Sequence, residues 1–244
     1  MYTTGLKPRS GNIYFIDFSP KSGFKVTLPS KNSRGGKFVR VTYGPKKLPL
    51  KLQTPTVSLP FGVSTYKDES TGVSSESLDM SLRGYDDASN GPMQALFKVL
   101  QAIDEKILQA AEANSEAYFG KKMSRELLAE FQRTVLKWSR NTEKNWPPTF
   151  KVKVAKDYSG QMPQVYDAAD KTTVHDASYI VKGSTAKLIF TFNSMYIISK
   201  TFGLSSRLVQ AVVLSRPLAD EGCMFIDDGD ELEVDAEATE PCDM

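Results

Sequence analysis

Apolar and polar residues alternate with a period of two in several short stretches of the chain, which is the pattern of a half-buried β-strand. The alternation is clearest in residues 24–28, 77–82 and 149–154. Further stretches rich in β-branched and aromatic residues are 13–18, 37–43, 186–192, 195–198 and 206–214. Turn residues separate these stretches at the spacing of an antiparallel sandwich or barrel. The sequence therefore predicts a mainly β domain.

Between residue 91 and about residue 140 the period changes to that of an amphipathic helix. Leu96, Leu100, Ile103 and Ile107 lie three or four residues apart, which places them on one helix face. Asn90 is the predicted N-cap of this helix. A second apolar stripe, after a predicted cap at Ser124, predicts a second helix; it consists of Leu127, Leu128, Phe131, Val135 and Trp138. We therefore expect a helical pair inserted in the β domain.

The folded domain is expected to span residues 1–218 and to end near Pro217. Asn193 and Ser194 are two consecutive polar residues between apolar stretches, and this pattern predicts a hairpin turn there. No internal repeat of fixed period is present.

Charge is divided unevenly along the chain, although the net charge is only +2. Residues 220–244 hold eleven Asp or Glu and no Lys or Arg, so residues 1–219 hold all 31 basic residues against 18 acidic ones. The predicted acidic tail, 219–244, is therefore expected to be disordered; its central acids are Asp227, Asp228, Asp230, Glu231, Glu233 and Asp235. It is either a solubilising tail or a mimic of a nucleic-acid backbone that competes for a basic groove.

Several functional classes are disfavoured by what the chain contains. Two cysteines and the single His175 are too few for a zinc site at any usual spacing, so no metal is expected. His175 lies in a polar stretch, no Gly-x-Ser-x-Gly surrounds a serine, and Gly35-Gly36-Lys37 departs from a phosphate-binding loop. We expect no enzyme and no cofactor. No signal peptide or membrane span is predicted, which favours a reducing compartment, with no secretion and no membrane partner.

The basic body favours a polyanion as the partner, because phosphates need positive charge and single-stranded nucleic acid also exposes base faces that stack on aromatic rings. Basic and aromatic residues interleave along the N-terminal part of the chain. The predicted nucleic-acid-binding residues are Arg34, Lys37, Arg40, Tyr43, Lys46, Lys47, Phe61, Tyr66, Lys151 and Lys153. Other aromatic residues, including Phe15, Phe18, Phe150, Phe190 and Phe192, are expected in the core.

The order of features resembles the single-stranded DNA-binding proteins of nucleocytoplasmic large DNA viruses, which are distantly similar to that of phage T7. The stretches that carry the resemblance are 36–43, 53–64, 77–84, 147–153, 165–167 and 202–204, followed by the acidic end. Here the chain ends Cys242-Asp243-Met244, whereas the tail of the phage relative ends in an aromatic residue, so no role is carried over for the final residue.

The resemblance implies an OB-fold with a helical insertion and binding of single-stranded DNA without sequence preference. It also implies dimerisation, roles in viral DNA replication, recombination and repair, and tail-bound replication proteins. The expected location is the host cytoplasm or nucleus, at sites of viral DNA replication. The alternative is a structural or scaffold virion protein that binds duplex DNA or acidic proteins.

Overall fold

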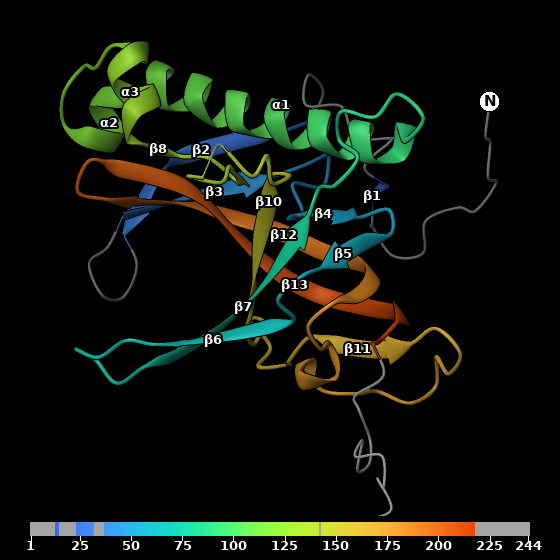
Figure 1. Cartoon of the computed structure of the whole chain (residues 1–244). Helices are drawn as coiled ribbons and strands as arrows, with labels where there is room; N and C mark the ends of the chain where they lie inside the picture. The colour runs from blue at the N-terminus through green and yellow to red at the C-terminus, as the bar shows by residue number, and fades with distance from the viewer. Residues whose placement is uncertain (1–12, 15–22, 32–36, 142, 218–244) are drawn as a thin grey trace, which may run out of the picture.

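The computed structural model describes residues 13–14, 23–31, 37–141 and 143–217 (Figure 1). Arg34, the core candidates Phe15 and Phe18, and the acidic tail lie outside the described residues. Thirteen strands of the described chain form one sheet. The N-terminal strands are β1 (Ile13–Tyr14), β2 (Lys25–Lys31), β3 (Lys37–Thr42), β4 (Leu50–Gln53), β5 (Val57–Leu59), β6 (Val63–Lys67) and β7 (Ser74–Ser81).

Three helices and the remaining strands follow in the second half of the chain. The helices are α1 (Gly91–Ala113), α2 (Ser115–Phe119) and α3 (Arg125–Phe131). The strands are β8 (Gln132–Arg133), β9 (Leu136–Lys137), β10 (Thr149–Val154), β11 (Gln164–Asp167), β12 (Ser184–Ile198) and β13 (Thr201–Ser215), with a 3-10 helix at Ala177–Tyr179 before β12. The prediction of a mainly β protein with helices after residue 90 is confirmed.

The long antiparallel hairpin β12–β13 organises the sheet. Along its other edge β12 pairs in turn with β3, β4 and β5. β5 then pairs with β7, β7 with β10, and β10 with β13, so the pairings close into a circuit. β10, β11 and β8 run parallel to β13. The sheet is therefore mixed, and the predicted antiparallel barrel is wrong in this respect.

The circuit encloses an aromatic core. Phe150, Phe190 and Phe192 are buried, as predicted, and their ring centroids lie 4.9 to 5.8 Å apart. Strict alternation places Phe150, Val152 and Val154 of β10 in this core and leaves Lys151 and Lys153 exposed.

The helices cover one end of the sheet (Figure 1). A second apolar cluster joins Ile107 of α1, Tyr118 of α2 and Leu128 of α3 to Val41 and Met195 of the strands. Both predicted N-caps are confirmed, because Asn90 accepts from the Met93 amide at 3.4 Å and Ser124 accepts from the Leu127 amide at 3.4 Å.

Two predicted elements differ from the structure. The helical insertion ends at Phe131 rather than near residue 140, because the backbone becomes extended at Gln132 and the amide of Val135 donates to the Asp104 carboxylate of α1 at 2.9 Å. The expected hairpin turn at Asn193 and Ser194 is instead an irregularity of register within the continuous strand β12.

Candidate nucleic-acid interface

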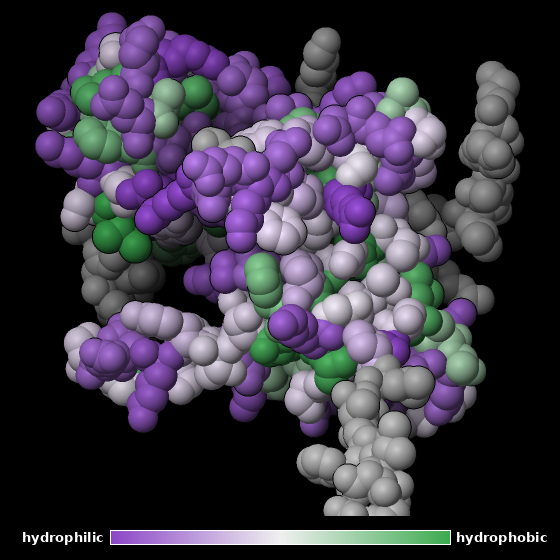
Figure 2. All heavy atoms as spheres, viewed as in Figure 1, coloured by the Kyte–Doolittle hydropathy of each residue, from purple (hydrophilic) through white to green (hydrophobic). Residues whose placement is uncertain are grey.

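A groove of about 650 Å³ opens where β10 and β13 separate, since these two strands pair only at Lys153 and Arg207. We call it the basic groove. Its five cationic lining residues are Lys37, Arg133, Lys137, Lys151 and Lys153. Among the described residues, no Asp or Glu lines it. Figure 2 shows the outline indented between the projecting β6–β7 hairpin and the part of the molecule that carries the helices.

The lysines of β10 reach the groove from the exposed face of the strand. Lys151 forms an ion pair with Asp79 of β7 at 2.8 Å, while about half of its side chain stays exposed. The Asp79 side chain is only 13% exposed, so the carboxylate is the less solvated partner of this pair. The exposed half of Lys151 is the part that a second anion in the groove can reach.

Arg133 and Tyr196 meet over Gly203 at the opposite wall of the groove. A Cβ on Gly203 would lie 2.7 Å from the Arg133 carbonyl and 2.8 Å from the Tyr196 hydroxyl. Only glycine therefore permits this approach of β8 to the β12–β13 hairpin. Burial raises the pKa of Tyr196, and the nearby Arg133 charge opposes the rise. Tyr196 is thus a neutral, half-buried wall residue beside a cation.

A second groove, of about 730 Å³, adjoins the first and shares Lys137 with it. We call it the aromatic groove. Phe61, Trp138 and Trp146 line it with 59%, 57% and 59% of their surfaces exposed, and Arg83 adds a second cation. Trp138 and Trp146 are the two tryptophans of the chain. Exposed rings of this size inside a groove offer flat apolar faces beside positive charge.

Different elements hold these rings. Trp138 follows β9 and packs edge-on against Tyr85 and Phe97, with ring centroids 5.7 and 6.2 Å away. Phe61 lies in the β5–β6 turn before Gly62, whose φ of +62° and contact with the 180–182 backbone exclude a side chain. The aromatic groove is therefore formed by residues distant in sequence.

Asp104 of α1 supports the strand segment that joins both grooves. Its carboxylate accepts from the Val135 amide, and its carbonyl accepts from the Gln132 side chain at 2.8 Å. Burial raises the pKa of Asp104 to about 6, against the opposing effect of the Val135 and Leu136 backbone amides and of the Lys137 charge. Burial also lowers the pKa of Lys137, which Asp104 partly restores. The helix thus fixes the position of a segment that bears Arg133, Lys137 and Trp138.

Four predicted binding residues lie in these grooves: Lys37, Lys151 and Lys153 in the basic groove and Phe61 in the aromatic groove. Lys37 also donates to the Tyr118 carbonyl at 3.4 Å.

The structure leaves five predicted residues outside both grooves. Arg40 is exposed on β3 opposite Ser194, which lines the basic groove. Tyr43 is half-buried and packs against the core. Lys46 and Lys47 lie in the exposed turn after it, and Tyr66 lies on the exposed β6 strand.

Sequence reasoning missed most of the aromatic groove. Trp138 was placed in the apolar stripe of the second predicted helix, and Arg133 and Lys137 fall within the same predicted insertion. Neither Arg83 nor Trp146 was among the predicted binding residues. The signal that could have identified them is the same interleaving of basic and aromatic residues that pointed to the N-terminal strands.

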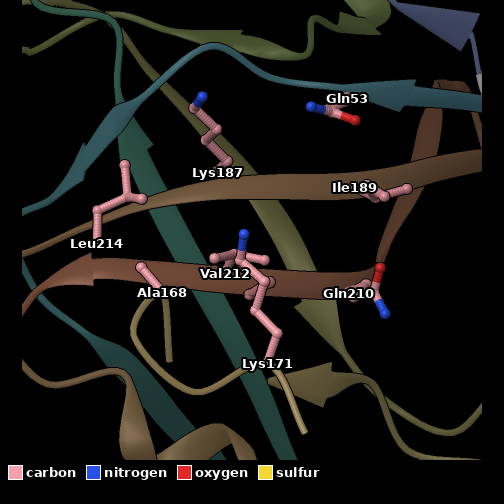
Figure 3. A pocket seen from close by; sticks show the side chains of 9 residues that line it. Gln53, Ala168, Lys171, Lys187, Ile189, Gln210, Val212 and Leu214 are labelled. Carbon is pink, nitrogen blue, oxygen red and sulfur yellow. The ribbon is translucent and has the colours of Figure 1, made fainter. Parts of the chain in front are cut away.

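Another groove on the described residues has fewer cationic and aromatic groups that could bind a polyanion. This groove, of about 270 Å³, is lined by residues of β12, β13 and a neighbouring loop. Figure 3 shows Lys187 projecting from β12 and Lys171 reaching from the loop toward β13. The groove has two cations and no aromatic lining residue.

His175 stacks on Tyr179 at 3.9 Å, and Arg216 lies 4.1 Å from the centre of the same ring. Two groups this close to the ring centre cannot lie on the same face of the Tyr179 ring, so Tyr179 is held between them.

The described residues contain no group of three or more metal-binding side chains. Within the same ranges, no helix has the length and apolar character needed to cross a membrane.

Comparison with solved structures found loose similarities to phage proteins. The single-stranded DNA-binding protein gp2.5 of bacteriophage T7 aligns with a TM-score of 0.44 and 15% identity, over 79% of this chain and all of that one. The single-stranded DNA-binding protein of bacteriophage Enc34, in complex with single-stranded DNA, aligns with a TM-score of 0.42 and 10% identity, over 80% of this chain and 98% of that one. TM-scores below 0.5 are too low to establish a shared fold.

No curated protein matches the chain. The model of a protein family matches residues 93–227, which is more than half of the chain. This match begins in α1 and covers the segments that carry Arg133, Lys137, both tryptophans and the β10 lysines. The chain belongs to this family, which is described as a family of unknown function (DUF5871).

Proposed function

We propose that this protein binds single-stranded DNA without sequence preference, through the adjoining basic and aromatic grooves. One observation carries the proposal: six cations and three exposed aromatic rings line two grooves that share Lys137. The cations are Lys37, Arg83, Arg133, Lys137, Lys151 and Lys153, and the rings are Phe61, Trp138 and Trp146.

The aromatic rings favour a single strand over a duplex. Bases in a duplex are stacked on one another, so their faces are not available to protein side chains. A single strand exposes these faces, and each base that stacks on a ring gains about 1–3 kcal/mol. The side chains of the basic groove would neutralise the phosphates that accompany those bases.

The direct test is a salt-resolved titration of the full-length protein with oligo-dT and with a duplex of equal charge. We expect tighter binding of oligo-dT, and a fall in affinity with salt whose log–log slope is about −0.7 per phosphate neutralised. Equal affinity for the duplex, or a salt-independent affinity, would contradict the proposal. Preference for the duplex would favour the scaffold alternative.

We propose that the acidic tail, 219–244, competes with DNA for the basic groove and recruits partner proteins when DNA displaces it. The support is the segregation of charge, since residues 220–244 hold eleven acids and no basic residue. An acidic segment that belongs to the same chain as a cationic groove has a high effective concentration there, so even weak attraction competes with DNA.

We further propose that the closed circuit β12–β5–β7–β10–β13 is the OB-fold-like barrel that the sequence resemblance implies. The same resemblance supports a role in viral DNA replication, recombination and repair, at replication sites in the host cytoplasm or nucleus. It also supports a homodimer and replication proteins as partners of the tail.

A further inference from the structure

A third groove, of about 370 Å³, lies beside the basic groove and carries the most exposed ring of the described chain. Tyr158 lines it with 85% of its surface exposed, together with Lys51 and Arg207. We call it the Tyr158 groove. None of these three residues was singled out as a binding residue from the sequence.

The loop that presents Tyr158 is held by its own hydrogen bonds. The Asp157 carboxylate accepts from the amides of Ser159 and Gln161 at 2.8 and 3.0 Å, and from the Ser159 hydroxyl at 2.6 Å. Gly160 closes the turn with a φ of +83°. A ring on such a turn loses little conformational freedom when it binds a ligand.

Arg207 fixes the side of the ring that faces the sheet. Its guanidinium lies 5.0 Å from the Tyr158 ring centre and donates to the Lys156 carbonyl at 3.1 Å. Because so much of Tyr158 is exposed, its other face stays open to a stacking partner. The pair therefore presents an aromatic face and a positive charge at one point.

The Tyr158 groove and the basic groove meet at a pair of cross-strand neighbours. Lys51, Thr191, Arg207 and Lys153 are successive register partners across β4, β12, β13 and β10. Lys153 lines the basic groove and Arg207 lines the Tyr158 groove. A cation therefore stands on each side of the boundary between the two grooves.

The route from the aromatic groove to Tyr158 is longer than one nucleotide. Thr149, which faces Lys137 across the β9–β10 pair, lies four residues before Lys153 on β10, or roughly 13 Å at the usual rise per strand residue. One further strand spacing of about 5 Å leads to Arg207. The aromatic groove and Tyr158 are therefore separated by more than one nucleotide unit, with cations between them.

We infer that the DNA track extends across the Lys153–Arg207 pair and that Tyr158 stacks one additional base at its end. This inference rests on the proposed function. Arg207 and Lys51 would contact the phosphate next to that base. The hydrogen bonds of the turn, from Ser159 and Gln161, lower the pKa of Asp157, so its carboxylate keeps its charge. This charge would repel a phosphate. We therefore place the uncharged base, rather than the phosphate, beside Asp157.

Oligonucleotide length separates this terminal subsite from the central grooves. The experiment measures the affinity of oligo-dT from about 4 to about 16 nucleotides, the range of site sizes in single-strand binding folds. Tyr158→Ala should bind the shortest oligonucleotides like the natural protein and the longer ones about 5- to 100-fold more weakly. Tyr158→Phe, which keeps the stacking face, should behave like the natural protein at every length.

Val174→Ala is the control, because Val174 is 54% exposed, lines none of the three grooves and is not a predicted binding residue. It should leave the dependence of affinity on length unchanged. Equal affinity of Tyr158→Ala and the natural protein at every length would overturn the inference, as would an equal loss at every length. Neither result would affect the proposed function, which is tested separately by the preference of the natural protein for oligo-dT over duplex and by the salt dependence of its affinity.

Discussion

At the scale of single residues, the candidate site depends on which negative groups already contact its lysines. Lys151 is held by Asp79 at 2.8 Å, and the Asp79 side chain is 13% exposed. This carboxylate contacts a lysine that lines the basic groove. It competes with a phosphate for Lys151, and its charge repels any strand in the basic groove.

Asp79→Asn should therefore raise the affinity for oligo-dT several-fold at low salt, because the amide leaves Lys151 free for a phosphate without removing a hydrogen-bonding side chain from β7. The gain should shrink as salt screens the interaction. A titration at two salt concentrations measures it. Asp86→Asn, at an exposed acid that lines neither groove, is the control. A loss of affinity in Asp79→Asn would show that Asp79 positions Lys151 for binding.

The two tryptophans allow binding to be separated from folding. Trp138 packs against Tyr85 and Phe97, whereas Trp146 has no ring partner among the described residues. Trp138→Ala should therefore lower the free energy of unfolding by about 1 kcal/mol as well as weaken binding. Trp146→Ala should weaken oligo-dT binding by about 1–3 kcal/mol and leave stability unchanged.

Chemical unfolding and oligo-dT titration of the two variants check this prediction. Quenching of tryptophan fluorescence by oligo-dT in the natural protein is a further measurement, since both tryptophans line the aromatic groove. Binding of Trp146→Ala with natural affinity would exclude stacking on this ring.

At the scale of elements, the sequence pattern correctly predicted those features that depend on interactions between neighbouring residues. The capped start of α1 and the alternation of β10 were correct because each depends on neighbouring residues. The backbone conformation of residues 132–137 depends instead on Asp104, which lies about thirty residues away in the sequence. The Asp104 carboxylate accepts from the Val135 amide and so favours an extended backbone there. The parallel pairing of β10 with β13 is equally long-range, so no local periodicity revealed the grooves.

The Asp104 contact predicts a dependence of stability on pH. Its pKa is about 6 in the folded protein and 3.8 ordinarily, so the folded state binds the proton more tightly. The resulting stabilisation is fully present below about pH 4 and is lost as pH rises through about 6, with a magnitude of up to about 3 kcal/mol.

Asp104→Asn keeps an acceptor for the Val135 amide but removes the buried charge. The variant should therefore gain stability relative to the natural protein as pH rises from 4 to 7. Urea unfolding of both proteins across this range measures the difference. A difference that does not change with pH would show that Asp104 is ionised at no cost, and would contradict the raised pKa.

At the scale of the whole molecule, positive and negative charge are separated along the chain. Residues 1–219 carry a net charge of +13 and residues 220–244 one of −11. A body with this charge attracts DNA from a distance, and the same field attracts the tail. The sequence alone therefore predicted a polyanionic partner, although it could not predict which cations gather in one groove.

Removal of residues 219–244 should consequently raise the affinity for oligo-dT several-fold at low salt. A tail that occupies the basic groove lowers the apparent affinity by the fraction of time for which the groove is filled. Because the attraction is electrostatic, the difference between full-length and truncated protein should disappear as salt rises. Neutral replacement of Asp227, Asp228, Asp230, Glu231, Glu233 and Asp235 by Asn or Gln should reproduce most of the gain at full length, which distinguishes charge from tail length. If both variants bound like the natural protein at every salt concentration, the tail would be a solubilising segment with no access to the groove.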